Sequence, residues 1–219
     1  MSRQAAATDL LRTLHDMGAA QLSPGASGNV SVRVEGGMLI SASGAVAATA
    51  SNDDLAFVPT HCRSLEHWPD DQPRPSSEWR MHQALYSSHP EAMAVVHCHS
   101  LHATALACQR RRIPPFHYMV SIAGGDDIPC ADYALFGSEE LSQIVCKTLQ
   151  QRRACLMANH GQICIGDSPA TALALAREVE SLAACYLASL QNGEPVLLTP
   201  QEMDDVYQAF SHYGQRLKD

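Results

Sequence analysis

Ala92-Met93-Ala94-Val95-Val96-His97-Cys98-His99 is the stretch of sequence from which the fold can be worked out. Its first five residues form a short apolar run, which is typical of a buried strand. Side chains alternate along a strand, so His97 and His99 point to one face while Cys98 points to the other. Two imidazoles on one face can bind a single metal ion. Two histidines that simply form hydrogen bonds at a strand end are an equally good interpretation of this stretch alone, because short motifs often arise by chance.

His160 is the candidate for a third ligand. It lies in Asn159-His160-Gly161, a break between two apolar runs that together are typical of a hairpin, and Gly161 permits close approach of another backbone. Three histidines with one open position form a typical catalytic zinc site. His102 competes as a ligand, but its place in an expected helix favours a position behind the ligands or facing solvent. The remaining histidines without a spacing argument are expected on the surface: His15, His61, His67, His82, His89 and His212.

Glu78 is the candidate acidic partner of these histidines. Ser76 or Ser77 can cap a helix that we expect to end near Ser88. In either case the acidic position of a capping box lies beyond Glu78, so local capping does not explain this residue. A favourable interaction with the helix dipole is the other explanation, and the sequence does not choose between it and a role at the metal.

Three short loops consist of glycine and hydroxyl residues: 27–29, 41–44 and 76–77. Backbone N–H groups, hydroxyls and a helix N-terminus bind phosphate well. Each loop alone is weak evidence, because turns are built from the same residues. None matches a Walker A motif or a dinucleotide-binding motif.

The rest of the chain predicts helices and hairpins in mixed order. We expect helices over 8–17, 100–108, 138–151, 168–191 and 199–210, a hairpin of strands 30–34 and 38–40, a short strand at 57–58 and an exposed loop over 61–75. Ser168-Pro169 is an N-cap followed by proline at the first helical position, and Thr199 with Glu202 makes a capping box. The pattern predicts one α/β domain over residues 1–219 with a substantially antiparallel sheet.

Composition excludes several classes of protein. The 219 residues are 46% hydrophobic, which indicates a globular chain, and the net charge of −8 argues against broad binding to nucleic acid or anionic membranes. No run reaches the ~18 apolar residues of a membrane span, and the N-terminus lacks a signal-peptide core. The eight cysteines include no C-x-x-C pair and lie mostly in apolar runs, so we expect small buried side chains in a reducing cytoplasm.

Lysine is scarce. Lys147 falls in an amphipathic helix and Lys218 is the penultimate residue, so neither is a good candidate for Schiff-base chemistry. The eleven histidines direct attention to metal or imidazole chemistry instead.

These motifs together resemble the class II aldolase/adducin family over nearly the whole chain. The resemblance rests on Gly28–Arg33, Leu39–Gly44, Pro75–Arg80, Ala94–Ser100, His117-Tyr118, Ile128–Cys130 and Asn159–Gly161. It implies a three-layer α/β/α fold with a mixed, mostly antiparallel central sheet. It also implies a zinc-dependent homotetramer with active sites at subunit interfaces, acting on a small phosphorylated sugar.

The resemblance also assigns roles to individual residues. His97, His99 and His160 resemble the zinc ligands, with Glu78 as a further ligand and as the acid/base. The phosphate clamp corresponds to Gly28, Asn29, Ser43, Gly44, Ser76 and Ser77. Tyr118 resembles the residue that protonates the aldehyde oxygen, and Phe136 and Tyr213 resemble residues that shape the aldehyde pocket.

The expected reaction is reversible cleavage of a ketose 1-phosphate to dihydroxyacetone phosphate and a small aldehyde such as lactaldehyde. L-fuculose 1-phosphate is the first candidate substrate, and a 5-deoxy or 5-methylthio pentulose 1-phosphate is the next. Relatives that epimerise pentulose phosphates or decarboxylate sugar-acid phosphates share the fold and remain alternatives. A non-catalytic adducin-like domain is disfavoured by the intact histidines and Glu78. A site of this kind also accepts manganese or cobalt.

Overall fold

The computed structural model describes residues 2–212 and contains a seven-stranded sheet in the order β3-β2-β1-β4-β7-β6-β5. All neighbouring strands are antiparallel except β5 and β6, so the sheet is mixed and mostly antiparallel, as expected. The strands are β1 (Asn29–Val34), β2 (Gly37–Ser41), β3 (Leu55–Pro59), β4 (Ala94–Cys98), β5 (Cys130–Ala131), β6 (Ala154–Met157) and β7 (Gly161–Gly166).

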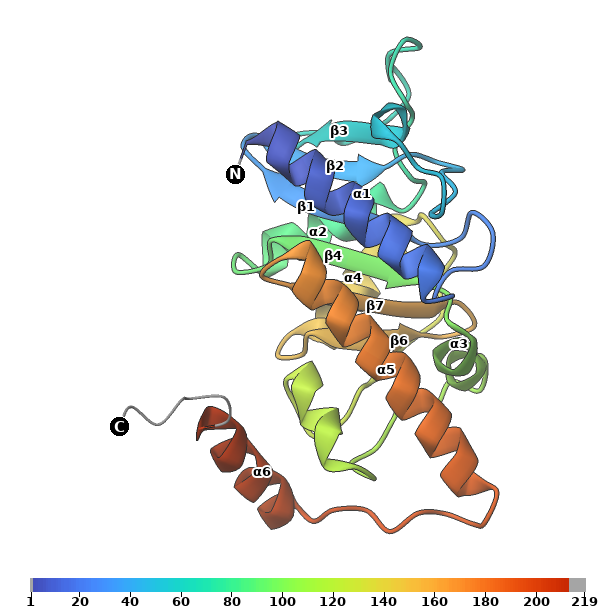
Figure 1. Cartoon of the computed structure of the whole chain (residues 1–219), viewed down its shortest axis with the longest axis vertical. Coiled ribbons are helices and arrows are strands. Elements are labelled where there is room, and N and C mark those ends of the chain that lie inside the picture. Colours follow the sequence, from blue (N-terminus) through green and yellow to red (C-terminus); the bar gives the residue numbers. More distant parts are fainter. Residues whose placement is uncertain (1, 213–219) are drawn as a thin grey trace.

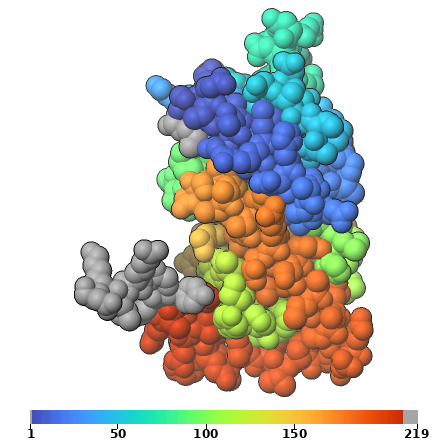
Figure 2. All heavy atoms as spheres, viewed as in Figure 1, coloured from blue at the N-terminus to red at the C-terminus, as the bar shows by residue number. Residues whose placement is uncertain are grey.

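Helices cover both faces of this sheet and give three layers (Figure 1). One face packs against α1 (Arg3–Ala19), α3 (Leu101–Cys108) and α5 (Pro169–Leu190). The opposite face packs against α2 (Trp79–Ser88) and α4 (Glu139–Leu149). Two 3-10 helices, η1 (Asn52–Asp54) and η2 (Tyr118–Ala123), lie in the connections. Figure 2 shows α1 and α5 side by side on the first face.

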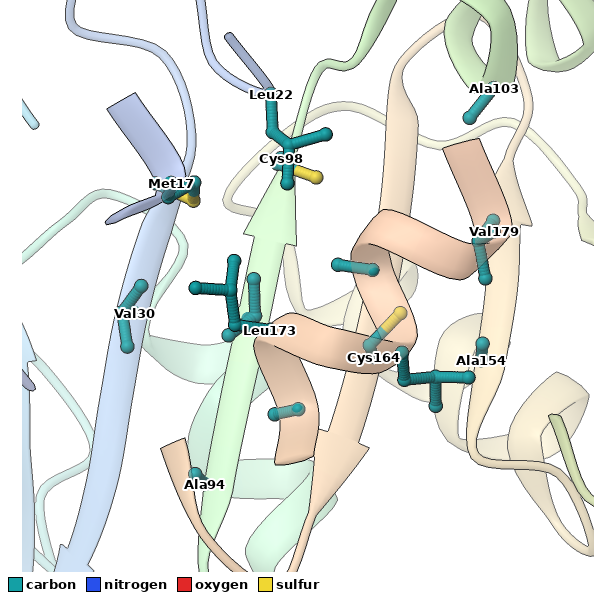
Figure 3. Packing of buried hydrophobic residues seen from close by; sticks show 14 of the residues in the cluster. Met17, Leu22, Val30, Ala94, Cys98, Ala103, Ala154, Cys164, Leu173 and Val179 are labelled. Atoms are coloured by element: carbon teal, nitrogen blue, oxygen red, sulfur yellow. The ribbon is translucent and has the colours of Figure 1, made fainter. Parts of the chain in front are cut away.

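The core is divided in two by the alternation of side chains along β4. Val96 and Cys98 pack on the α1 and α5 side, where Figure 3 shows Cys98 near Leu22. Val95 packs on the α2 and α4 side, and His97 has the same parity. Each fully buried valine contributes roughly 1.5–3 kcal/mol of hydrophobic stabilisation, so the register of this strand is strongly determined. His97 therefore faces the α2 layer.

Several local signals led to the right elements. Ser168 caps α5 with its hydroxyl accepting from the Thr171 N–H, and Pro169 is its first residue. The side chain of Thr199 accepts from the Glu202 N–H while the Glu202 carboxylate accepts from the Thr199 N–H, which confirms the capping box that opens α6 (Pro200–His212). The hairpin of β6 and β7 turns at residues 158–160 as expected.

Two expectations about elements were wrong in detail, and one strand was missed. The strand expected at 92–96 is β4, Ala94–Cys98, because its ends are set by pairing with β1 and β7 rather than by the apolar run. The N-cap of α2 is Glu78, not Ser76 or Ser77, and it makes no side-chain capping bond. The two-residue strand β5 has no local signal, because its pairing with β6 is long-range.

Residues 191–212 form a C-terminal arm that leaves the end of α5 and carries α6 (Figure 1). The N–H of Leu198 donates to Pro115 O at 2.8 Å, and Met203 is buried where α6 packs against η2. In the described residues, no helix is both long enough and apolar enough to span a bilayer.

Candidate active site

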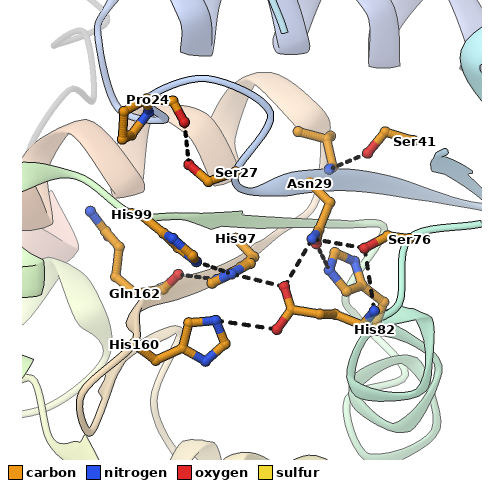
Figure 4. A network of polar contacts seen from close by, with 12 residues as sticks. Pro24, Ser27, Asn29, Ser41, Ser76, His82, His97, His99, His160 and Gln162 are labelled. Atoms are coloured by element: carbon orange, nitrogen blue, oxygen red, sulfur yellow. Dashed lines mark hydrogen bonds and ion pairs between the residues drawn. The ribbon is translucent and has the colours of Figure 1, made fainter. Parts of the chain in front are cut away.

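The three predicted histidines meet at one end of β4 and β7. Their rings lie 4.8–4.9 Å apart between centroids, and one nitrogen from each falls within a group spanning 4.8 Å (Figure 4). His97 and His99 point to the same face, as strand alternation predicted, and their Nε2 atoms are 2.9 Å apart. Gly161 brings the turn that carries His160 close to β4, since a Cβ there would lie 2.5 Å from Cys98 O. This arrangement can hold one metal ion.

His97 is oriented by the backbone of β7. Its Nδ1 lies 2.8 Å from Gln162 O, a carbonyl that can only accept, so Nδ1 carries a proton and Nε2 offers its lone pair to the cluster. The ring is fully buried, which leaves it no alternative partner in water. An N–H to carbonyl bond of this kind is the usual way in which a metal-binding histidine is held in one orientation.

Glu78 enters the cluster from the N-cap of α2. Its Oε2 lies 3.0 Å from His97 Nε2, and its Oε1 lies 3.3 Å from His160 Nε2. Oε1 is buried and has no hydrogen-bond partner among the described residues. Sequence reasoning was therefore right that capping does not account for Glu78, although the cap itself was misplaced.

The electrostatics of the cluster favour cation binding. Burial, with the charges of His97 and His160, lowers the pKa of His99 to about 3, and burial with the charge of His97 lowers the pKa of His160 to about 4. Burial alone would raise the pKa of Glu78, but His97, His160 and Asn29 outweigh it and hold that pKa well below its usual value. Burial would lower the pKa of His97, yet Glu78 holds it above its usual value. Two neutral imidazoles and a buried carboxylate whose Oε1 has no hydrogen-bond partner among the described residues fit a divalent metal ion.

The phosphate-clamp residues lie together beside this cluster. Gly28, Asn29, Ser43, Gly44, Ser76 and Ser77 all line one cavity of about 420 Å³, together with Glu78, His99 and His160. Among the described residues that line it there is no lysine or arginine. Gly28 has φ +79° and a Cβ there would lie 2.7 Å from His97 O, so only glycine fits this position without strain. The clamp residues can therefore bind an anion through hydroxyls and amides, without a lysine or arginine.

Backbone hydrogen bonds join the loop 41–44 to the segment 74–76 that leads into α2. The Ser43 N–H donates to Arg74 O at 2.9 Å, and the Ser76 N–H donates to Ser41 O at 3.0 Å. Asn29 joins the third loop to them, because its Nδ2 donates to Ser76 Oγ at 3.0 Å, so the three loops form one wall.

Of the residues expected at the aldehyde pocket, Phe136 lies at the cavity and Tyr118 lies away from it. Phe136 lines the cavity and is 62% exposed. Tyr118 is 49% exposed, does not line the cavity of its own chain, and stacks between His117 and Phe210. Tyr213 lies outside the described residues.

Sequence reasoning missed one polar residue of the site and misplaced another histidine. His82 is fully buried and hydrogen-bonds to Asn29, and His89 is also buried, so both expectations of surface positions were wrong. The signal for His82 was its spacing of four residues from Glu78, which places both side chains on one face of a helix. His102 pairs with Glu180 at 2.7 Å and is not part of the cluster, as expected.

Comparison with known proteins shows the family of the chain. The family model "Class II Aldolase and Adducin N-terminal domain" matches residues 8–187. The chain belongs to the class II aldolase and adducin family. It is 40% identical over 220 residues to L-fuculose phosphate aldolase of Escherichia coli (strain K12), covering 100% of both chains. A solved structure of L-fuculose 1-phosphate aldolase superposes with a TM-score of 0.88 at 31% identity, covering 96% of this chain and 98% of that one.

A second relative carries a different substrate in its name. The 5-methylthioribulose-1-phosphate/5-deoxyribulose-1-phosphate aldolase of Rhodospirillum rubrum is 44% identical over 193 residues, which cover 88% of this chain and 85% of the relative. The chain is thus an aldolase of the lyase class, and metal dependence is a trait of its family.

Proposed function

We propose that this class II aldolase reversibly cleaves a ketose 1-phosphate to dihydroxyacetone phosphate and a small aldehyde. The observation that carries the proposal is the single cavity in which three histidines, Glu78 and a neutral anion clamp converge. The clamp would fix the phosphate through Gly28, Asn29, Ser43, Gly44, Ser76 and Ser77. Binding at that point places the neighbouring carbons of the sugar beside the histidine cluster, which raises the effective concentration of the reacting groups.

His97, His99 and His160 would hold one zinc ion per subunit, with Glu78 as a fourth ligand when no substrate is bound. When bound, the ion supplies a Lewis acid that stabilises the negative charge left when the carbon–carbon bond breaks. The exposed Lys147 does not line the cavity, so no lysine among the described residues offers the Schiff-base route.

Glu78 would be the acid/base. In condensation it takes a proton from the hydroxymethylene carbon of dihydroxyacetone phosphate, and in cleavage it returns that proton to the same carbon. Its buried Oε1 supports this role, because that oxygen accepts no hydrogen bond from the described residues and only lies near His160 Nε2 at 3.3 Å.

Tyr118 would donate the proton to the developing alkoxide of the aldehyde in condensation and take it back in cleavage. Because this side chain lies outside the cavity of its own chain, the role requires an assembly in which Tyr118 of the partner subunit completes the site. A homotetramer with interfacial active sites, each built from domains spanning 1–219, is therefore part of the proposal. Phe136 and Tyr213 would border the aldehyde. The eight free cysteines support a reducing cytoplasmic location.

L-fuculose 1-phosphate is the first substrate we propose, because the similarity to the fuculose phosphate aldolase extends over the full length of both chains. A 5-methylthio- or 5-deoxyribulose 1-phosphate is the second, because the Rhodospirillum rubrum relative has the higher identity over most of the chain. In both, a ketose phosphate yields the same three-carbon product.

The test is a coupled assay for dihydroxyacetone phosphate with each ketose 1-phosphate, with and without chelator. We expect turnover of at least one of them, its loss on chelation and its recovery with zinc. L-ribulose 5-phosphate serves as the control substrate. Formation of an epimer from it without triose phosphate, and no cleavage of the ketose 1-phosphates, would replace the proposal with an epimerase.

A further inference from the structure

A buried chain of hydrogen bonds runs from α2 and β1 to the acid/base Glu78 (Figure 4). His82 Nε2 lies 2.5 Å from Asn29 Oδ1, and Asn29 Nδ2 donates to Glu78 Oε2 at 3.0 Å. On the other side of the ring, His82 Nδ1 lies 2.7 Å from Ser31 Oγ, which in turn lies 2.8 Å from the Tyr86 hydroxyl. The His82 side chain is fully buried, so none of its atoms in this series of hydrogen bonds is exposed to water.

The carboxylate determines the direction of every bond in this chain. If Asn29 were turned over, its Oδ1 would face Glu78 Oε2, and two oxygens that can only accept would lie about 3 Å apart. Asn29 must therefore donate to Glu78, so its Oδ1 must accept from His82. His82 then carries its proton on Nε2, Nδ1 accepts from the Ser31 hydroxyl, and Ser31 accepts from Tyr86.

Burial keeps the members of the chain in these states. It lowers the pKa of His82 to about 3, so the ring is neutral, and it raises the pKa of Tyr86, so the phenol retains its proton. A neutral imidazole has one donor and one acceptor, which is what the two neighbours require. His82 does not line the cavity.

The two carboxylate oxygens of Glu78 have different neighbours. Oε2 accepts from Asn29 and lies 3.0 Å from His97 Nε2, whereas Oε1 is buried, has no hydrogen-bond partner among the described residues and lies 3.3 Å from His160 Nε2. An asparagine free to rotate about its last bond would present donor and acceptor to the carboxylate with similar ease, and Oε2 would no longer be held.

We propose that His82 is a positioning residue, which as the Nε2-protonated ring orients the Asn29 amide so that Oε2 of Glu78 is held and Oε1 transfers the proton. The catalytic part of this inference rests on the proposed function. It adds a residue that touches neither substrate nor metal, and it assigns one oxygen of the acid/base to the reaction.

The test compares two variants of His82, each of which places an amide where one of the two ring nitrogens lies. The amide of His82→Gln reaches the place of Nε2 and can still donate to Asn29, whereas that of His82→Asn reaches only the place of Nδ1. We expect His82→Gln to retain kcat within about threefold, and His82→Asn to lose about 10–100-fold in kcat with little change in KM. Equal kcat values for the two variants would overturn the proposal.

A second measurement does not depend on activity and uses a variant only to assign a signal. In wild-type protein labelled with ¹⁵N-histidine, long-range proton–nitrogen correlation reports the tautomer of each ring, and His82→Gln identifies the signal. We expect His82 to show a protonated Nε2 and a bare Nδ1. The opposite tautomer would overturn the proposal. If the wild-type chain cleaves no ketose 1-phosphate, the proposed function fails, while the spectrum still decides the direction of the hydrogen-bond chain.

Discussion

The histidine cluster and the C-terminal arm are held in the molecule in different ways. His97 is paired in register with Asn29 on one side and with Ile163 on the other, in the middle of the sheet. The arm is attached by Met203 at η2, by one bond from the Leu198 N–H, by the Tyr207 hydroxyl donating to Asp126 Oδ1 at 3.1 Å, and by Phe210 stacking on Tyr118. The histidine cluster is therefore held at the ends of central strands of the sheet, whereas Tyr118 and the arm present groups at the surface.

This difference suggests a division of labour in the proposed reaction. Proton exchange at dihydroxyacetone phosphate needs only the cluster, Glu78 and the clamp. Cleavage and condensation also need the proton donor on the aldehyde side, Tyr118, which lies outside this cavity in the single chain. Variants on either side should therefore separate the two half-reactions.

The largest effect is expected for His97→Ala. Loss of this ligand removes several kcal/mol of charge stabilisation in the transition state, so activity should fall more than about 1,000-fold. Metal content measured on the purified protein should fall with it. His67→Ala is the matched control, because His67 is exposed and remote from the cluster. Full activity of His97→Ala would show that the cluster is not the reacting centre.

The next effect is expected for Glu78→Gln. The amide keeps the shape of the side chain but cannot take a proton from carbon, so kcat should fall by about 10²–10⁴-fold while the metal is retained. Proton exchange into dihydroxyacetone phosphate should be lost to the same extent. Glu66→Gln, in an exposed loop, is the control. Normal turnover by Glu78→Gln would remove Glu78 from the mechanism.

Tyr118→Phe tests the other side of the comparison. Cleavage should fall by about 100-fold, because the group that takes the proton from the hydroxyl that becomes the aldehyde oxygen is lost. Proton exchange at dihydroxyacetone phosphate and the melting temperature should remain close to wild type. Tyr207→Phe removes a hydroxyl from the arm and serves as control. An equal loss of both half-reactions in Tyr118→Phe would contradict the division of labour.

The smallest effect is a pH dependence of stability that originates beside the cluster. The pKa of His82 is lowered to about 3 in the folded chain, against about 6.5 in the unfolded chain. Between these two pKa values the unfolded chain binds more protons than the folded chain. The contribution of His82 to the free energy of unfolding is therefore at its maximum above about pH 6.5. It falls on acidification by up to about 1.4 kcal/mol per pH unit. Urea unfolding between about pH 7 and about pH 5 measures this slope.

His82→Gln is the control for that slope, because an amide does not titrate. Other groups of the cluster titrate in both proteins, so the difference between the two slopes isolates His82. Identical slopes would mean that His82 does not keep its lowered pKa in solution.

Most elements with a strong local signal could be predicted. In these elements the residues that determine the structure lie within a few positions of one another. Examples are Ser168-Pro169, the Thr199–Glu202 capping box and the hairpin around Asn159. The ends of β4 and the existence of β5 could not be predicted in this way, because both are set by pairing with strands distant in sequence. The N-cap of α2 was misplaced because two adjacent serines offered better capping side chains than Glu78, whose carboxylate is turned to the cluster instead.

The sequence by itself determined that His97 and His99 share a face, because the alternation of side chains along a strand is a local property of the backbone. It also determined that no well-placed lysine exists for covalent catalysis. Only the tertiary structure decided that Asn29 lies next to His97 and that the turn at Gly161 brings His160 to the same point. Asn29 and His97 are joined by the register of β1 and β4, and register depends on the whole buried face of the sheet. The hydrogen bonds from His82 to Asn29 and from Asn29 to Glu78 also needed the tertiary structure, because they form where α2 packs on β1.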